Sequence, residues 1–183
     1  MKYLALLLLC VVPFTHAYAG QQIMFYQMGE KDPAVWNIVK KYFTGKDYQV
    51  SMYEGTDNME KHIENVRRIN KAGGALFLAM DFSISETNEI FVAFSDAKAG
   101  KKAILGIDEV PAVYADDSKE LATLIASSFN KTAKDLPLFP LLGVNIPGIF
   151  LRITCTKEDT INVFDKMHES FQKYSIRGLR HER

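Results

Sequence analysis

Apolar residues recur along this chain in two different patterns, and the two patterns alternate. Short apolar runs with few interruptions are typical of strands, above all of strands that are buried on both faces. They predict strands over residues 22–28, 48–53, 75–80, 87–95 and 148–155. The central run, ALFLAM, is followed directly by Asp81, so a charged residue stands at the end of a strand that is predicted to be buried.

Between these runs, apolar residues recur every three or four positions, which predicts helices with one buried side. The helices span residues 34–43, 58–71, 118–131 and 158–174, with Pro33 in the first turn of the first and Ser118 as the N-cap of the third. Residues 96–117 follow neither pattern, and the sequence assigns them no element. The side chains expected to point inward are Val35, Ile38, Val39, Tyr42, Met59, Ile63, Val66, Ile69, Leu121, Leu124, Ile125, Phe129, Ile161, Phe164, Met167 and Phe171.

The alternation of strands and helices predicts an α/β fold, with a mainly parallel or mixed central sheet and helices on both of its faces. A chain of 183 residues with 48% hydrophobic residues is long enough for one compact core, so we expect a single domain over residues 20–183. Ligands of such sheets bind outside the carboxyl ends of the strands. The site should therefore be sought after Phe25, at Asp81 and around Arg152.

The first 19 residues have the composition of a secretory leader. Lys2 supplies a basic start, residues 3–14 are apolar, and Ala17 and Ala19 flank one larger residue as in a cleavage site. The apolar run is shorter than the roughly 20 residues that span a bilayer, and Pro13 interrupts it. We therefore expect a signal peptide over residues 1–19, a periplasmic or secreted protein, and no membrane span after cleavage.

Charge and cysteine content narrow the classes of function. The chain has 22 Lys and Arg residues and 22 Asp and Glu residues. Removal of the leader deletes one charged residue, Lys2, and leaves a slight acidic excess. A nucleic acid partner is therefore not expected. Cys155 is then the one remaining cysteine, which excludes a disulfide within the chain. No histidine is near Cys155 in sequence, so we expect a small buried side chain rather than a catalytic thiol.

Four segments, in order, carry a resemblance to a known family. IMFYQMGEKDPA stands where that family has a strand followed by DPGHGGxDPGA, and YQVSMYEGTD is similar to its YxVxLTRxTD. IENVRRINKAGGALFLAMDFS is similar to its helix LxxRVxxAN followed by the strand LFISIHAN, and IPGIFLRITC to its last strand, MPAVLVEIGF. The chain thus resembles the zinc-dependent N-acetylmuramoyl-L-alanine amidases of the bacterial cell wall, of the type 3 catalytic domain. The resemblance covers nearly all of the chain after the leader and implies their phosphorylase/hydrolase-like architecture.

The resemblance also implies a zinc ion held by two histidines and a glutamate, and a further glutamate as general base. Here the first histidine is missing from the loop that contains Gly29 and Glu30, and no carboxylate stands in register for the glutamate ligand. The second histidine falls at Asp81 and the catalytic glutamate at Arg152. The sequence therefore predicts a degenerate member that lacks the zinc ligands, with no metal, no cofactor and no catalytic residue.

The strands that carry Asp81 and Arg152 end near each other if the family topology holds. Two interpretations of the two residues follow. In one, Arg152 fills the space of the lost metal and contacts a carboxylate of a peptide ligand. In the other, the two residues form a salt bridge that only neutralises the vacated site. Together with Gly29 and Glu30 they are the candidate binding residues of the vacated site. Loss of either Asp81 or Arg152 would cost ~3–5 kcal/mol of stability if the pair is buried.

The leading hypothesis is a catalytically inactive protein of the amidase fold that binds peptidoglycan fragments or a cell-wall enzyme. The alternative is an active cell-wall hydrolase with a non-standard site, in which His62, Asp81 and one of Glu30, Glu60 or Glu64 converge on a metal. A third possibility is an assembly role in which residues 96–117 supply the contact surface. The sequence does not indicate an oligomeric state. His62, His168 and His181 are each expected to be solvated surface side chains.

Overall fold

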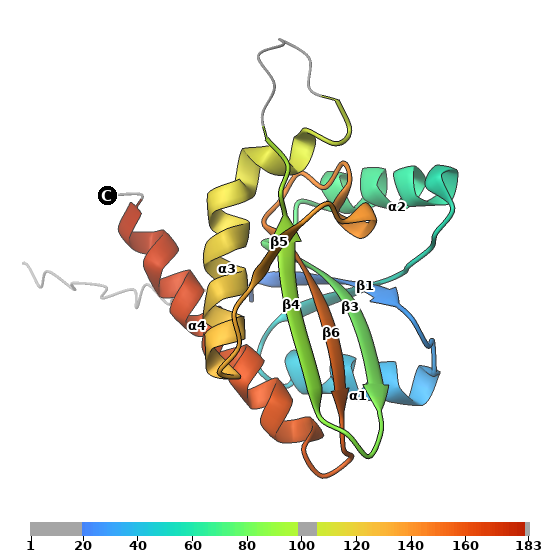
Figure 1. The fold of residues 1–183 in the computed structure, drawn as a ribbon, viewed down its shortest axis with the longest axis vertical. Helices are drawn as coiled ribbons and strands as arrows, with labels where there is room; N and C mark the ends of the chain where they lie inside the picture. Colours follow the sequence, from blue (N-terminus) through green and yellow to red (C-terminus); the bar gives the residue numbers. More distant parts are fainter. Residues whose placement is uncertain (1–19, 99–105, 182–183) are drawn as a thin grey trace, which may run out of the picture.

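A computed structural model describes residues 20–98 and 106–181, with the side chains of 176–181 excepted. The expected signal peptide, residues 1–19, lies outside the described residues. The elements form one six-stranded sheet with helices on both faces (Figure 1). They are β1 (Gln22–Met28), α1 (Pro33–Thr44), β2 (Gln49–Glu54), α2 (Met59–Ala72), β3 (Leu76–Ile84), β4 (Glu89–Ser95), η1 (Val110–Tyr114), α3 (Ala115–Ser128), β5 (Lys134–Leu136), η2 (Phe139–Leu141), β6 (Gly148–Cys155) and α4 (Thr160–His181).

The strand order is β2-β1-β3-β6-β4-β5. The four strands β2, β1, β3 and β6 are parallel to one another, β4 is antiparallel to β6, and β5 is parallel to β4. This confirms the predicted α/β fold with a mixed central sheet. The carboxyl ends of β1, β3 and β6 consequently lie together at one edge of the sheet.

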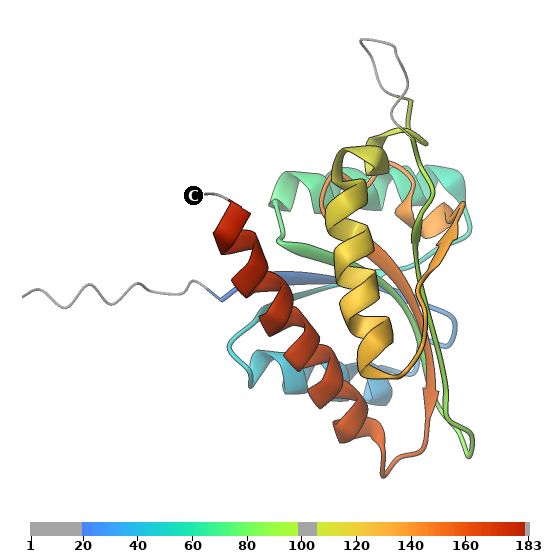
Figure 2. The same ribbon diagram turned by 60° about the vertical axis from the view of Figure 1, so that its left-hand side comes forward.

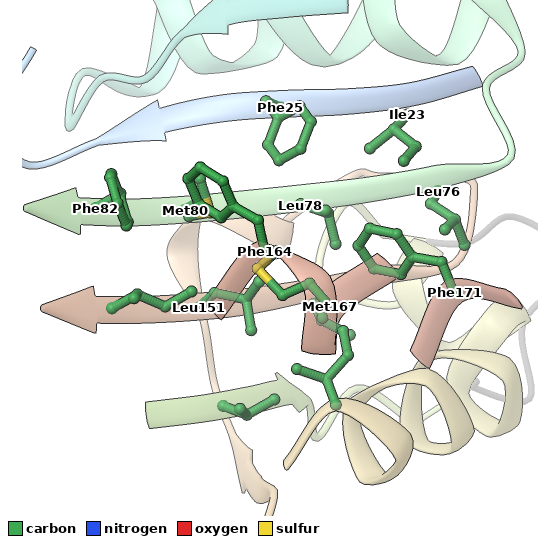
Figure 3. Packing of buried hydrophobic residues seen from close by; sticks show 14 of the residues in the cluster. Ile23, Phe25, Leu76, Leu78, Met80, Phe82, Leu151, Phe164, Met167 and Phe171 are labelled. Carbon is green, nitrogen blue, oxygen red and sulfur yellow. The ribbon is translucent and has the colours of Figure 1, made fainter. Parts of the chain in front are cut away.

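The larger part of the core lies on the face of the sheet that α1, α3 and α4 cover (Figure 2). Alternate residues of the strands point to this face, because side chains of a strand alternate between its two sides. In Figure 3, Phe164, Met167 and Phe171 of α4 lie over β3 and β6. All three are buried, as their spacing in the sequence predicts.

The opposite face is covered by a single long helix, α2, and by the short helix η2. Two side chains of α2 hold the segment around η2 by hydrogen bonds to its backbone. His62 Nε2 lies 3.0 Å from the Leu142 carbonyl oxygen, and Asn70 Nδ2 donates to the Gly143 carbonyl at 2.9 Å. Asn70 Oδ1 in turn accepts from the backbone N–H of Asn145 at 2.9 Å. Polar contacts thus attach this loop to the helix that packs beneath it.

The buried sides of three helices differ in part from the predicted ones. Ile38 is 39% exposed, Met59 44% and Ile161 52%, although all three were expected to point inward. In α1 the inner positions are taken by Trp36 and Phe43, with Val39 between them. Larger aromatic side chains bury more apolar area, so the helix is rotated toward them and Ile38 is left outside.

The region without a pattern, residues 96–117, is only partly described, since residues 99–105 are not among the described residues. Its end forms η1 and the first turn of α3, so α3 begins before Ser118 and Ser118 is not the N-cap. Ser118 is instead buried, and its Oγ accepts a 3.0 Å hydrogen bond from the backbone N–H of Gly148. The edge strand β5 was not predicted, because its three residues are all exposed and show no apolar pattern.

No helix of residues 20–98 and 106–181 is both long and apolar enough to cross a membrane.

Candidate functional site

The carboxyl ends of the parallel strands bring Asp81 and Arg152 together. Asp81 of β3 lies in register between Met28 of β1 and Arg152 of β6. Directly paired residues of neighbouring strands point to the same face, which here is the α2 face of the sheet. Arg152 Nε donates to Asp81 Oδ2 at 3.2 Å. The pairing that the resemblance suggested is therefore present.

Gly29 lies directly against the Asp81 carboxylate. Its φ is +64°, a backbone conformation that side chains disfavour, and an added Cβ would lie 2.0 Å from Asp81 Oδ1. Glu30 follows in the exposed loop, where its backbone carbonyl accepts a 3.2 Å hydrogen bond from Trp36 Nε1. Its carboxylate makes no hydrogen bond or ion pair with any residue that the structure describes. The structure thus places Gly29, Asp81 and Arg152 in contact, whereas the Glu30 carboxylate makes no hydrogen bond or ion pair with them.

The Arg152 guanidinium lies over an aromatic side chain. Its Cζ is 6.0 Å from the ring centroid of Phe150, and the Phe150 ring meets Phe91 of β4 edge to face at 6.3 Å. The two terminal nitrogens of Arg152 have no hydrogen-bond partner among the described residues. A guanidinium presents its donors in a flat fork that fits a carboxylate or a phosphate. The side chain is therefore oriented at Nε and free at its outer edge.

The Asp81–Arg152 pair is a surface pair rather than a buried one. The side chains are 27% and 56% exposed, respectively. Ion pairs in such positions contribute roughly 0.2–1 kcal/mol, because water screens the charges. The cost of several kcal/mol that was considered for a buried pair does not apply here.

The loop after β1 is held by its own polar contacts. Lys31 Nζ donates to Glu54 Oε1 at 2.8 Å and to the Gly55 carbonyl at 2.9 Å, and this lowers the pKa of Glu54. Asp32 caps α1 by accepting a 2.8 Å hydrogen bond from the backbone N–H of Ala34. Lys31 and Asp32 therefore shape the turn and the start of the helix.

His62 is not a solvated surface residue, which corrects the prediction. It is fully buried, with Nδ1 3.0 Å from the Tyr26 hydroxyl and Nε2 3.0 Å from the Leu142 carbonyl. The Leu142 carbonyl can only accept a hydrogen bond, so Nε2 carries the proton of the neutral ring. Nδ1 is then unprotonated and accepts the hydrogen bond of the Tyr26 hydroxyl. Burial lowers the pKa of His62 and keeps the ring neutral. The signal for its burial is its spacing of four and seven residues from Val66 and Ile69, which share the inner side of α2.

His168 also differs from the prediction. It is half-buried, and its Nδ1 lies 3.1 Å from the hydroxyl of Tyr48, so the two side chains join α4 to the start of β2. Burial lowers the pKa of His168, and nearby Lys46 acts in the same direction. The side chain of His181 lies outside the described part of the chain.

The residues present do not fit a zinc ion of the amidase kind. The Asp81 carboxylate is paired with Arg152, whose charge would repel a cation, and Glu54 at the end of β2 is paired with Lys31. Within residues 20–98 and 106–181 no three His, Cys, Asp or Glu side chains are grouped to hold a metal. His62 cannot converge with Asp81 on a metal, because both of its ring nitrogens are engaged. The specific arrangement considered for a non-standard hydrolase is therefore not found.

Cys155 is confirmed as a small buried side chain. It is 1% exposed, and burial raises the pKa of its thiol. A thiol with a raised pKa is a poor nucleophile at neutral pH.

Solved structures identify the fold that carries these residues. An N-acetylmuramoyl-L-alanine amidase from Clostridium difficile 630 superposes with a TM-score of 0.50 over 88% of this chain and 98% of its own, at 12% sequence identity. The amidase Ami1 from Mycobacterium smegmatis superposes with a TM-score of 0.50 over 85% and 97% of the two chains, at 11% identity. The fold is that of the N-acetylmuramoyl-L-alanine amidases. No family model and no curated protein matches the sequence.

The amidase fold changes the meaning of the strand ends. The positions that the resemblance assigns to a zinc-binding histidine and to the catalytic glutamate hold Asp81 and Arg152, which pair with each other. A guanidinium has no acceptor and stays protonated at any working pH, so Arg152 cannot take a proton from water. The pair presents a cation that is half exposed, beside an aromatic ring, with two donor nitrogens that have no partner among the described residues.

Proposed function

We propose that this protein is a secreted or periplasmic single-domain protein of the amidase fold that binds a peptidoglycan fragment and does not hydrolyse it. Residues 1–19 would be removed as a signal peptide, and residues 20–183 would form the working domain. One observation carries the proposal: Arg152 is anchored at Nε by Asp81, while its terminal nitrogens are left without a partner in the described chain.

The chemistry of Arg152 favours a carboxylate as the ligand group. The terminal nitrogens would take both oxygens of a carboxylate, and the Phe150 ring below would exclude water from one side. The solved neighbours are named as amidases of N-acetylmuramoyl-L-alanine. The alanine of that compound ends in a carboxylate, which is the kind of group that Arg152 would bind. Asp81 would act as the positioning residue, and Gly29 would allow its carboxylate to lie close to β1.

The test is calorimetric titration of the mature chain with N-acetylmuramoyl-L-alanyl-D-isoglutamine and with the same compound amidated at its free carboxylate. We expect the acid to bind and the amide to bind at least about tenfold more weakly, because charge-assisted hydrogen bonds contribute roughly 1.5–3 kcal/mol. The variant Arg152→Gln should lose the same discrimination.

The matched control is Arg67→Gln, which removes an exposed arginine of α2 that makes no ion pair with a described residue. It should bind like the unmodified protein. Equal binding of acid and amide, or an unchanged affinity in Arg152→Gln, would contradict the proposal. So would release of the sugar from the peptide during the titration, because that product requires hydrolysis of the amide bond.

A further inference from the structure

A cavity lies on the other face of the sheet from Asp81 and Arg152. It is bounded by α3, by β4 and by the segment that leads from α3 back to β5, which run side by side in Figures 1 and 2. Its volume is about 270 Å³. Its lining residues are Phe94, Lys119, Thr123, Ser127, Lys131, Thr132 and Ala133.

The helix places its lining residues in a single row. Lys119, Thr123 and Ser127 are four positions apart, so they lie on the same side of α3 and span about 12 Å at 1.5 Å per residue. The chain then turns back at Asn130, whose φ is +56°, and Lys131 N–H donates to the Ala126 carbonyl at 2.8 Å. Lys119 and Lys131 therefore stand toward opposite ends of the row, with hydroxyl groups between them.

The described lining of the cavity contains hydrogen-bond donors and no carboxylate. Neither lysine forms an ion pair with a residue of the described chain. The hydroxyls of Ser127 and Thr132 make no hydrogen bond within residues 20–98 and 106–181, whereas Thr123 Oγ1 donates to the Lys119 carbonyl at 2.7 Å. The positive charge of the two lysines and the unpaired hydroxyl groups favour a ligand that carries hydrogen-bond acceptors and negative charge.

The apolar part of the lining adds a second requirement for the ligand. Phe94 and Ala133 form an apolar surface in the cavity. A compact anion such as phosphate would reach one lysine and leave this surface uncovered. A ligand that meets every part of the lining has two anionic groups with an apolar group between them. The volume lies below the roughly 300–1,000 Å³ of drug-sized sites, so the ligand is short.

We propose that this cavity binds a short acidic peptide segment in which an apolar side chain lies between two carboxylates. The carboxylates pair with Lys119 and Lys131, and the apolar side chain covers Phe94. The site is independent of the Arg152 site, because α3 and Phe94 belong to the opposite face of the sheet. It gives the protein a second contact, with an acidic protein partner.

The probe is the peptide Glu-Leu-Glu, acetylated and amidated at its ends, added to the full mature chain and followed by nuclear magnetic resonance and calorimetry. We expect shifts at Phe94 and along α3, and binding that weakens as salt is raised. Lys119→Ala and Lys131→Ala should each weaken binding about two- to fivefold, as for exposed ion pairs, and the double variant by more than either. Lys134→Ala is the matched control, because Lys134 is exposed on β5 and does not line the cavity.

Two further ligands separate this proposal from simple attraction of anions. Gln-Leu-Gln lacks the charges and Glu-Gly-Glu lacks the apolar side chain, so both should bind more weakly than Glu-Leu-Glu. The proposal is overturned if Glu-Gly-Glu or inorganic phosphate binds as tightly as Glu-Leu-Glu, or if the double lysine variant binds like the unmodified protein. Neither result depends on Arg152, so this test can fail while the muropeptide test succeeds.

Discussion

The two faces of the sheet are closed by different kinds of contact. On one face, three helices cover a continuous apolar layer that includes aromatic side chains of α1 and α4. On the other, α2 and η2 cover a smaller apolar cluster, and polar side chains such as His62 and Asn70 hold the covering loop. The difference is one of proportion. The first face is closed mainly by apolar packing, with the Ser118–Gly148 and His168–Tyr48 hydrogen bonds added to it, whereas on the second face hydrogen bonds from α2 hold the covering loop itself.

β3 shows the difference along a single strand. Leu78, Met80 and Phe82 point to the three-helix face and are all buried. On the other side, Ala79 is buried under the α2 cluster, but Asp81 two residues later is partly exposed. The covering layer ends before the strand does. This leaves the carboxyl ends open to a ligand without weakening the main core.

Phe164→Ala should give the largest loss of stability, because it removes a ring from the centre of the three-helix face. Phe164 is fully buried and its ring lies 5.3 Å from that of Tyr42, 5.8 Å from Phe43 and 5.3 Å from Phe82. We expect the free energy of unfolding, measured in urea, to fall by about 3–5 kcal/mol.

The control for this variant comes from the same helix. Ile161→Ala truncates a side chain that the sequence pattern placed inward but that is 52% exposed. It should change the free energy of unfolding by no more than about 0.5 kcal/mol. A loss of several kcal/mol in Ile161→Ala would mean that α4 is rotated relative to the described packing.

His62→Ala tests the polar closure of the second face. It leaves the buried Tyr26 hydroxyl and the Leu142 carbonyl without their partner, and each unsatisfied buried group costs about 1–3 kcal/mol. We expect the free energy of unfolding near pH 8 to fall by at least about 2 kcal/mol. Lys61→Ala, at the exposed position before it, should have little effect.

The same variant has a signature in pH. The pKa of His62 is lowered by burial, so the unfolded chain takes up its proton first as the pH falls. The neutral ring therefore stabilises the fold above about pH 6.5, and this contribution is lost as the pH drops toward the lowered pKa. The difference in stability between the unmodified protein and His62→Ala should shrink between about pH 8 and about pH 5. His168 is present in both proteins, so its own lowered pKa cancels in this comparison. A difference that stays constant with pH would mean that the pKa of His62 is the same in the folded and the unfolded chain, which contradicts the burial of the ring.

Much of the fold could be predicted from the sequence because its strands are strongly apolar. The strand at residues 148–155 and the buried side of α4 from Phe164 to Phe171 are confirmed. The errors lie where tertiary contacts decide which side of a helix is buried. Ile161 and Ile38 have the spacing of an inward-facing row, but the buried side chains of their helices include Phe164 and Trp36 instead. β5 carries no signal of its own, since it is ordered only by pairing with β4.

The site was predictable in part for a similar reason. The ends of parallel strands are adjacent in any such sheet, so the approach of Asp81 to Arg152 follows from the topology. The exposure of the pair does not follow from it, because that depends on where α2 stops covering the sheet. The burial of His62 was missed because a histidine on a polar helix carries no hydrophobic signal, although it shares the spacing of the buried residues.

Of the three variants Phe164→Ala, His62→Ala and Asp81→Asn, the last should have the smallest effect on stability, because Asp81 lies at the exposed strand ends and not under either covering layer. The pair is exposed, so the free energy of unfolding should fall by no more than about 1 kcal/mol. In a double-mutant cycle with Arg152→Gln, the coupling energy should lie in the same range of roughly 0.2–1 kcal/mol. A coupling of several kcal/mol would mean that the pair is shielded from water in solution. The amide of Asp81→Asn can still accept the hydrogen bond from Arg152 Nε, but without a charge it holds the guanidinium less firmly. A small coupling energy together with weaker muropeptide binding in Asp81→Asn would therefore mean that Asp81 orients Arg152 and does not hold the fold together.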